Sequence, residues 1–220
     1  MTDPNKTHIT AIIDCSGSMS RLTTDTIGGF NKFIADQTAL PGEATVTLIL
    51  FNHQYNVVYS NKNVNEVPEM TPSVYHPNGN TALYDALGRG VRDTGVALEA
   101  LPERDRPGTV IVLLITDGEE NSSVEFSGET GRVAVKDMVD HQIQKYNWVV
   151  VFMGANIDAK AVGGSLGIPS NMSVDFEASF DGTRALYNTI SSGTMMYREA
   201  ATKGTARPDF VENPDQVLGK

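Results

Sequence analysis

The sequence predicts an α/β domain with a three-layer, doubly wound architecture: helices on both faces of a mostly parallel, six-stranded sheet with one antiparallel edge strand. Apolar runs of strand length alternate along the chain with stretches of helical period, as in strand–helix–strand units. The run at 109–116 is almost wholly apolar, so we expect it at the centre of the sheet. The runs at 45–51 and 57–59 are joined by a loop too short for a parallel crossover, so the latter strand must be antiparallel.

Each element has its own signal in the order of the chain. The first strand is a short apolar run, and the first helix places Ile27, Phe30 and Ile34 on one face. A loop with three prolines leads to a long helix whose apolar residues recur at helical spacing. The last strand is the weakest signal. The predicted strands are 8–13, 45–51, 57–59, 109–116, 148–153 and 172–176, and the predicted helices are 27–34, 81–101, 135–146, 158–166 and 186–197.

Length and composition limit the possible classes of protein. The 220 residues suffice for one large α/β domain, and the net charge of −10 disfavours binding to nucleic acid or to an anionic membrane. A single cysteine, Cys15, excludes an internal disulfide framework and fits a reducing compartment. The first residues lack the apolar run of a signal peptide, and no apolar run could span a bilayer. We therefore expect a cytoplasmic protein.

One domain accounts for most of the chain. We assign residues 1–201 to it and residues 202–220 to a polar tail, because no periodicity continues beyond the last helix. The tail carries Pro208 and Pro214. It is either disordered or laid over the surface of the domain.

Oxygen-bearing side chains follow three of the predicted elements. Asp14, Ser16 and Ser18 follow the first strand, Thr81 follows the proline-rich loop, and Asp117 follows the central strand. If the two strands are neighbours, these five side chains meet at the carboxyl edge of the sheet, where ligands bind in folds of this kind. A set made only of oxygens suits Mg²⁺ or Mn²⁺, fits Ca²⁺ less well and does not suit Zn²⁺.

The pattern Asp-x-Ser-x-Ser, then Thr, then Asp resembles the metal-ion-dependent adhesion site of von Willebrand factor type A (vWA) domains. The flanking segments 81–87 and 115–118 are similar as well, and the resemblance spans about 7–201. The segments 154–158 and 163–167 are similar to stand-alone members from bacteria and phages, a less specific match. One departure is Gly79-Asn80 before the threonine, where many relatives carry two glycines.

The resemblance implies a Rossmann-like sheet with the strands that begin at His8 and Thr109 side by side in the middle. It implies that Ser16, Ser18 and Thr81 bind the metal through their hydroxyls, and that Asp14 and Asp117 act mostly through bound water. A cation held by neutral hydroxyls keeps its charge and attracts an anionic ligand. We therefore expect a protein-binding module, not an enzyme, which captures a carboxylate of a partner; some small members resemble adaptors, including adaptors of AAA+ ATPases.

Simpler interpretations exist for each of these residues. The serines and Thr81 could cap helices, and Asp117 with Gly118 could form a turn. Cys15 reads as a small buried hydrophobe, and Asp158 as a helix cap. The competing function is a metal-dependent hydrolase or phosphotransferase that uses the same site. The chain lacks the Gly-x-Ser-x-Gly elbow of serine hydrolases, and an aspartyl phosphotransferase would need a second carboxylate where Ser16 stands.

Overall fold

A single sheet of six strands organises the protein in a computed structural model that describes residues 2–205, 209–211 and 213–219. Neighbouring strands run parallel except at one edge, where the second and third strands pair antiparallel. The predicted fold class is therefore confirmed, including the two strands expected in the middle. In spatial order the strands are β3 (Tyr55–Asn63), β2 (Glu43–Phe51), β1 (Asp3–Asp14), β4 (Pro107–Thr116), β5 (Val149–Ala155) and β6 (Ser173–Phe176).

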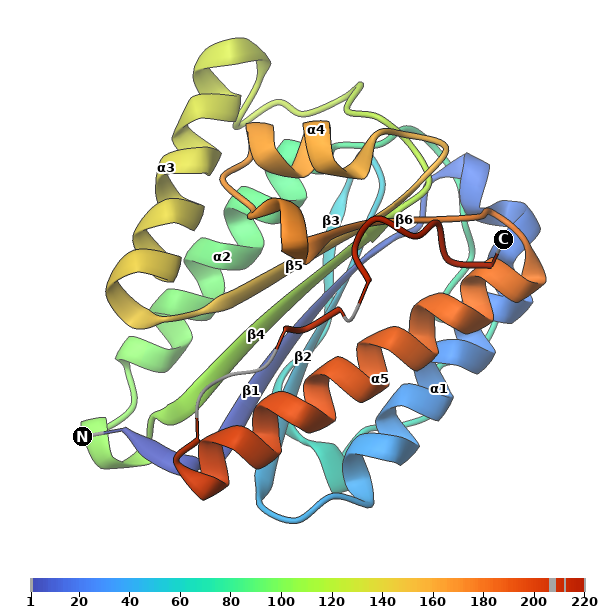
Figure 1. Ribbon diagram of the computed structural model, residues 1–220. Coiled ribbons are helices and arrows are strands. Elements are labelled where there is room, and N and C mark those ends of the chain that lie inside the picture. Colours follow the sequence, from blue (N-terminus) through green and yellow to red (C-terminus); the bar gives the residue numbers. More distant parts are fainter. Residues whose placement is uncertain (1, 206–208, 212, 220) are drawn as a thin grey trace.

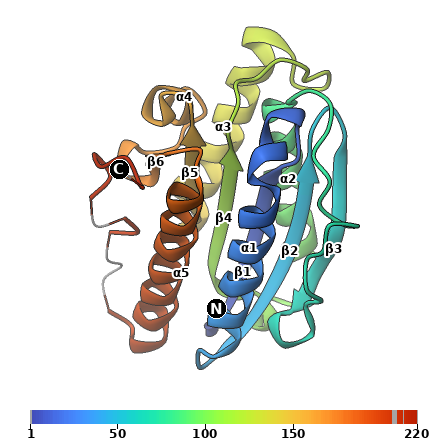
Figure 2. The same ribbon diagram turned by 90° about the vertical axis from the view of Figure 1, so that its right-hand side faces the viewer.

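Helices cover both faces of this sheet, as Figures 1 and 2 show. Apolar side chains fill both spaces between sheet and helices, which gives two core clusters with the sheet between them. Among the described residues, no helix has the length and apolar character needed to cross a membrane. One face is covered by α1 (Thr23–Thr38) and α5 (Phe180–Lys203), and the other by α2 (Leu83–Glu99), α3 (Gly128–Tyr146) and α4 (Ala159–Ser165).

Two strands are longer than the sequence indicates. β1 begins at Asp3, and this early part pairs with β4 near Pro107. β3 extends to Asn63 and pairs along the length of β2. Most side chains of these extensions are exposed or half-buried, so neither contains the apolar run that signals a buried strand. Helix α2 is shorter than the predicted 81–101, because its first turn begins only at Leu83.

A cluster of polar side chains is buried on the α2 face of the sheet. His8 on β1 places Nδ1 2.8 Å from the hydroxyl of Thr45 on the neighbouring strand. Its Nε2 lies 3.2 Å from the hydroxyl of Thr10 and 3.3 Å from that of Thr47. Burial lowers the pKa of His8 to about 4, so the ring is neutral at physiological pH.

The C-terminal segment lies against α5 and β6 (Figure 1). Phe210 and Val211 are buried in the core cluster on the α5 face. Farther on, the amide of Leu218 donates to the carbonyl of Asp175, and the amide of Glu177 donates to the carbonyl of Leu218, both bonds being 2.8–2.9 Å long. These contacts place Leu218 beside Phe176 in an isolated parallel bridge at the free edge of β6. Residues 206–208, 212 and 220 of the tail expected at 202–220 lie outside the described residues.

Candidate metal centre

The two predicted carboxylates lie at the carboxyl ends of neighbouring strands. β1 and β4 pair in parallel with Ile13 beside Ile115, so Asp14 and Thr116 end the two strands together and Asp117 follows directly. Figure 2 shows this end of the sheet at the top, where the arrowhead of β4 points. The position agrees with the general rule that ligands bind beyond the carboxyl ends of parallel strands.

Asp14 is a fully buried carboxylate held by two donors. The amide of Ser16 donates to its Oδ1 at 2.7 Å, and the hydroxyl of Thr116 donates to its Oδ2 at 2.6 Å. Burial raises the pKa of Asp14 to about 6, and the charge of Asp117 adds to the rise while the Thr116 and Ser16 hydrogen bonds oppose it. At neutral pH the site therefore holds a poorly compensated negative charge, which a cation would stabilise.

The serine hydroxyls connect this carboxylate to the second one. Ser16 Oγ lies 3.1 Å from Ser18 Oγ, and the Ser18 hydroxyl donates to Asp117 Oδ1 at 2.5 Å. The other carboxylate oxygen, Asp117 Oδ2, is buried and has no hydrogen-bond partner among the described residues. A buried carboxylate oxygen without a donor is energetically costly unless another positive group completes it.

Thr81, two residues before α2, places its hydroxyl close to Gly118 and to the side chain of Ser18. A methyl group built on Gly118 would lie 3.5 Å from Thr81 Oγ1 and 3.8 Å from Ser18 Oγ, so both hydroxyls border the glycine that follows Asp117. The structure thus gathers all five predicted side chains: four form a chain of direct contacts, and Thr81 lies across Gly118 from Ser18. Whether they ligate a metal stays a prediction.

Backbone contacts between loops fix these positions. The amide of Gly17 donates to the carbonyl of Gly79 at 3.0 Å, and the amide of Asn78 donates to the carbonyl of Cys15 at 2.9 Å. Gly79 has a φ of +73°, a conformation that favours glycine. Asn121 makes two hydrogen bonds to the backbone of Thr81. Its side-chain oxygen accepts from the Thr81 backbone amide at 2.8 Å, and its backbone amide donates to the Thr81 carbonyl.

The capping alternatives fail for the hydroxyl residues. Ser16 stands at the N-cap of a short 3₁₀ helix, Gly17–Leu22, but its side chain makes no capping hydrogen bond. The N-cap of α2 is Ala82, so Thr81 does not cap that helix. In contrast, the interpretation of Asp158 is confirmed, because its carboxylate accepts from the Ala161 amide at 2.9 Å. The interpretation of Cys15 is also confirmed: it is buried, and burial raises the pKa of its thiol to about 11.

Sequence reasoning missed three residues that shape the site. Thr116 orients Asp14, and Tyr75 donates its hydroxyl to the Asp14 carbonyl at 2.7 Å from a fully buried position. Arg21 approaches Asp117 from the 3₁₀ helix. Thr116 could have been suspected, since a polar residue ends an otherwise apolar strand. The residues next to Tyr75 and Arg21 in the sequence do not indicate a role at the site, because each of the two contacts an aspartate that is far away in the sequence.

The ligand types fit a hard divalent cation. Among residues 2–205, 209–211 and 213–219, no group of three or more His, Cys, Asp or Glu side chains could hold a metal. The described residues therefore contain no site built from three or more such side chains. Two carboxylates combined with three hydroxyls match the oxygen ligands of Mg²⁺ and Mn²⁺, and Asp117 Oδ2 accepts no hydrogen bond from the described residues.

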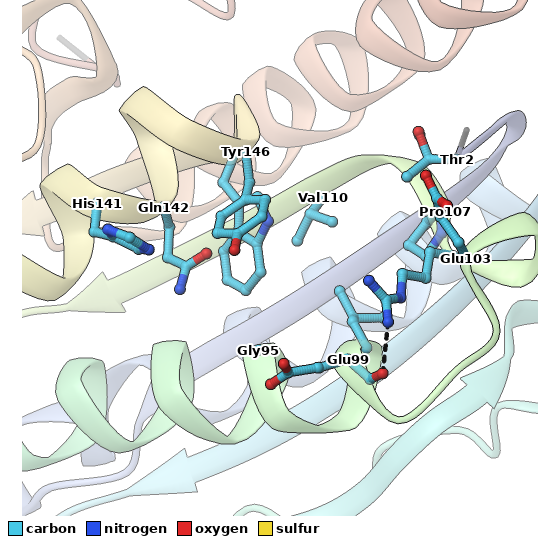
Figure 3. A pocket seen from close by; sticks show the side chains of 13 residues that line it. Thr2, Gly95, Glu99, Glu103, Pro107, Val110, His141, Gln142 and Tyr146 are labelled. Atoms are coloured by element: carbon cyan, nitrogen blue, oxygen red, sulfur yellow. Dashed lines mark hydrogen bonds between the residues drawn. The ribbon is translucent and has the colours of Figure 1, made fainter.

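A separate cavity of about 480 Å³ lies at the opposite end of the sheet, where β4 begins. Figure 3 shows His141, Gln142 and Tyr146 of α3 on one side and Glu99 on the other, with a bond from Arg106 to the Glu99 carbonyl. None of the five predicted site residues lines this cavity. The predicted metal centre is instead built at the loops above the sheet.

Comparison with known proteins identifies the fold. No protein-family model and no curated protein sequence matches this chain. Among solved structures, a von Willebrand factor type A protein from Catenulispora acidiphila is 17% identical over 87% of this chain and 43% of its own, with a TM-score of 0.55. Proximal thread matrix protein 1 from the mussel byssus is 16% identical over 89% and 46%, with a TM-score of 0.54. The ArnB paralog VWA2 from Sulfolobus acidocaldarius is 16% identical over 84% and 44%, with a TM-score of 0.51.

The chain spans less than half the length of each of these solved neighbours. At this level of identity the likeness concerns the fold, and two of the neighbours are named as von Willebrand factor type A proteins. The sheet order with its single antiparallel edge agrees with this comparison. The chain therefore has the fold of a von Willebrand factor type A domain.

Proposed function

We propose that this chain is a metal-dependent binding module that captures an acidic group of a protein partner. The observation that carries the proposal is the chain of contacts from Asp14 through Ser16 and Ser18 to Asp117, which ends at a buried carboxylate oxygen that accepts no hydrogen bond from the described residues. A bound Mg²⁺ or Mn²⁺ would supply an electrophilic centre for an oxygen of the partner's carboxylate.

The roles proposed for the five side chains favour binding of an anionic group of a partner. Ser16, Ser18 and Thr81 would hold the cation through neutral hydroxyls, while Asp14 and Asp117 stay engaged with Thr116 and Ser18. Neutral ligands leave most of the positive charge available to an incoming anion. The structure of the mussel protein has zinc in its metal-ion-dependent adhesion site (MIDAS) motif, so Zn²⁺ should be titrated as well as Mg²⁺ and Mn²⁺.

The described residues around the site favour binding over the activation of water. Asp14 is committed to two hydrogen bonds inside the protein, and Ser18 occupies one oxygen of Asp117. His53 and His76 are exposed side chains on the neighbouring loops, where a general base is poorly preorganised. A hydrolytic metal site needs such a base, so we propose binding without turnover.

The partner would present a carboxylate at its surface. The chain itself carries a net charge of −10, so a long-range attraction to an acidic protein is not expected. Recognition would therefore depend on the local charge of the metal. Adaptor function toward an AAA+ ATPase is one form that such a partnership could take.

Metal binding can be tested first, without knowing the partner. Mg²⁺, Mn²⁺ and Zn²⁺ should each be titrated while the melting temperature is followed, because a ligand of the folded state raises it with concentration. Ser16→Ala and Thr81→Ala should remove the response while the domain stays folded. Ser73→Ala is the matched control, since this exposed hydroxyl lies on the proline-rich loop and contacts only Thr71 among the described residues.

Partner capture is tested by affinity purification with and without EDTA. The proposal expects a protein that is retained only with metal and is lost in the Thr81→Ala variant. Retention of the same partner in excess EDTA would contradict it. Metal-dependent hydrolysis of a phosphoester or peptide that disappears with Asp117→Asn would favour the competing enzyme function.

A further inference from the structure

Arg21 is a positively charged residue that contacts the candidate metal centre. Its guanidinium Nη2 lies 3.5 Å from Asp117 Oδ2, the carboxylate oxygen without a hydrogen bond. Arg21 and Ser18 both belong to the 3₁₀ helix Gly17–Leu22. Residues three apart share a side of such a helix, so Ser18 and Arg21 reach the two oxygens of one carboxylate.

The pair is asymmetric in its exposure. The side chain of Asp117 is fully buried, whereas 56% of the Arg21 side chain is exposed. Apart from this ion pair, Arg21 makes no hydrogen bond or ion pair within the described residues. The carboxylate is therefore fixed, and the guanidinium is free to rotate into solvent.

A buried arginine elsewhere in the protein shows the contacts that fix a guanidinium in place. Arg198 on α5 is buried and donates to the carbonyls of Gln37, Pro41 and Gly42 and to the Gln37 side chain. Those contacts tie α5 to the end of α1. Arg21 has none of this network, so its position does not stabilise the fold in the same manner.

We propose that Arg21 is an exchangeable counter-ion of Asp117, which occupies this charge in the metal-free protein and withdraws when a divalent cation binds. The inference rests on the proposed metal-binding function and adds a residue that sets the affinity. Asp14 and Asp117 together bring two negative charges to the site, and Arg21 neutralises part of them. An incoming cation loses that share of the attraction and is repelled by the guanidinium until the side chain moves away.

The expected effect is modest because Arg21 is largely exposed. Solvent-exposed ion pairs are weak, so removing the guanidinium should tighten metal binding about two- to fivefold. The difference should shrink near about 1 M salt, where the screening length falls to about 3 Å. Arg21 thus acts against metal binding, the opposite of what a ligand or a supporting residue would do.

The test is calorimetric titration of Mn²⁺ into the full chain at low and high salt. Wild type is compared with Arg21→Gln, which removes the charge, and with Arg21→Lys, which keeps it. Arg104→Gln is the matched control, because it removes one exposed positive charge, partnered with Asp105, at the amino end of β4. Unfolding in EDTA of Arg21→Gln, Asp117→Asn and the double variant measures the ion pair without metal.

The inference is supported if Arg21→Gln binds Mn²⁺ about two- to fivefold more tightly at low salt than wild type, with Arg104→Gln and Arg21→Lys near wild type. Equal or weaker binding by Arg21→Gln, while wild type binds normally, overturns the inference and leaves the proposed function intact. Absence of binding by both proteins overturns the proposed function and this inference together. The unfolding cycle should show an Arg21 contribution that vanishes once Asp117 is replaced; a contribution that persists also overturns the inference.

Discussion

Replacing Asp14 with asparagine tests the electrostatics of the metal-free site. The substitution preserves the shape of the side chain and the acceptor for the Ser16 amide, which now bonds to Oδ1. The new amide group can donate to Thr116 Oγ, because the Thr116 hydroxyl has a second acceptor in the Gly118 carbonyl at 3.1 Å. The variant therefore removes the charge without leaving a buried polar atom unpaired.

The magnitude follows from the pKa of Asp14, which burial raises from its ordinary 3.8 to about 6. A group whose folded pKa is raised stabilises the protein below its unfolded pKa, and this stability is lost as pH rises through the folded value. The loss is on the order of 3 kcal/mol above about pH 6. Asp14→Asn should thus gain up to about 3 kcal/mol at neutral pH and nothing near pH 4.

Urea unfolding in EDTA at several pH values measures this gain. A difference of this size corresponds to a rise in melting temperature of about 6 to 12 °C for a domain of this length. In Mn²⁺ at more than about 200 times its Kd the order should reverse, because the ion then stabilises wild type by more than about 3 kcal/mol and does not stabilise the variant. Asp181→Asn is a suitable control, since it neutralises an exposed carboxylate on α5 that pairs only with Arg184 among the described residues.

Two results would refute the reasoning. If Asp14→Asn is no more stable than wild type at neutral pH in EDTA, the buried carboxylate is not a source of repulsion. If the gain is the same at pH 4 as at pH 7, it does not come from ionisation of Asp14.

Three further predictions concern neighbouring residues. Burial lowers the pKa of His8 to about 4, so the unfolded chain takes up a proton before the folded protein does. As pH falls from 6.5 to about 4, the protein should therefore lose on the order of 3 kcal/mol of stability. Urea unfolding in the Asp14→Asn background should show this slope, and His8→Gln should abolish it. Thr116→Val should lower stability by about 2 kcal/mol and weaken Mn²⁺ binding in calorimetry, whereas Thr116→Ser should keep both, since only valine leaves Asp14 and the Gly118 amide without their hydroxyl partner. Gly79→Ala should cost about 1 to 2 kcal/mol in thermal unfolding, because its φ of +73° is unfavourable for alanine; an unchanged melting temperature would show that the loop relaxes.

The sequence by itself determined the fold class, the antiparallel edge and the central position of β4, because periodicity, loop length and an apolar run are local properties of single segments. The place of β1 beside β4 was implied only by the resemblance to vWA domains. It also singled out the five oxygen-bearing residues, because each stands in a loop close to the carboxyl end of a predicted strand or to the start of a predicted helix. Their convergence could be expected once the two strands were taken as neighbours.

Only the tertiary structure decided what surrounds those residues. The raised pKa of Asp14 depends on burial and on Thr116, which is distant in the chain. The ion pair of Arg21 with Asp117 and the packing of Phe210 against α5 have no periodic pattern in the sequence. Burial, hydrogen-bond pairing and charge contacts are properties of segments brought together from far apart, so no local pattern of residues encodes them.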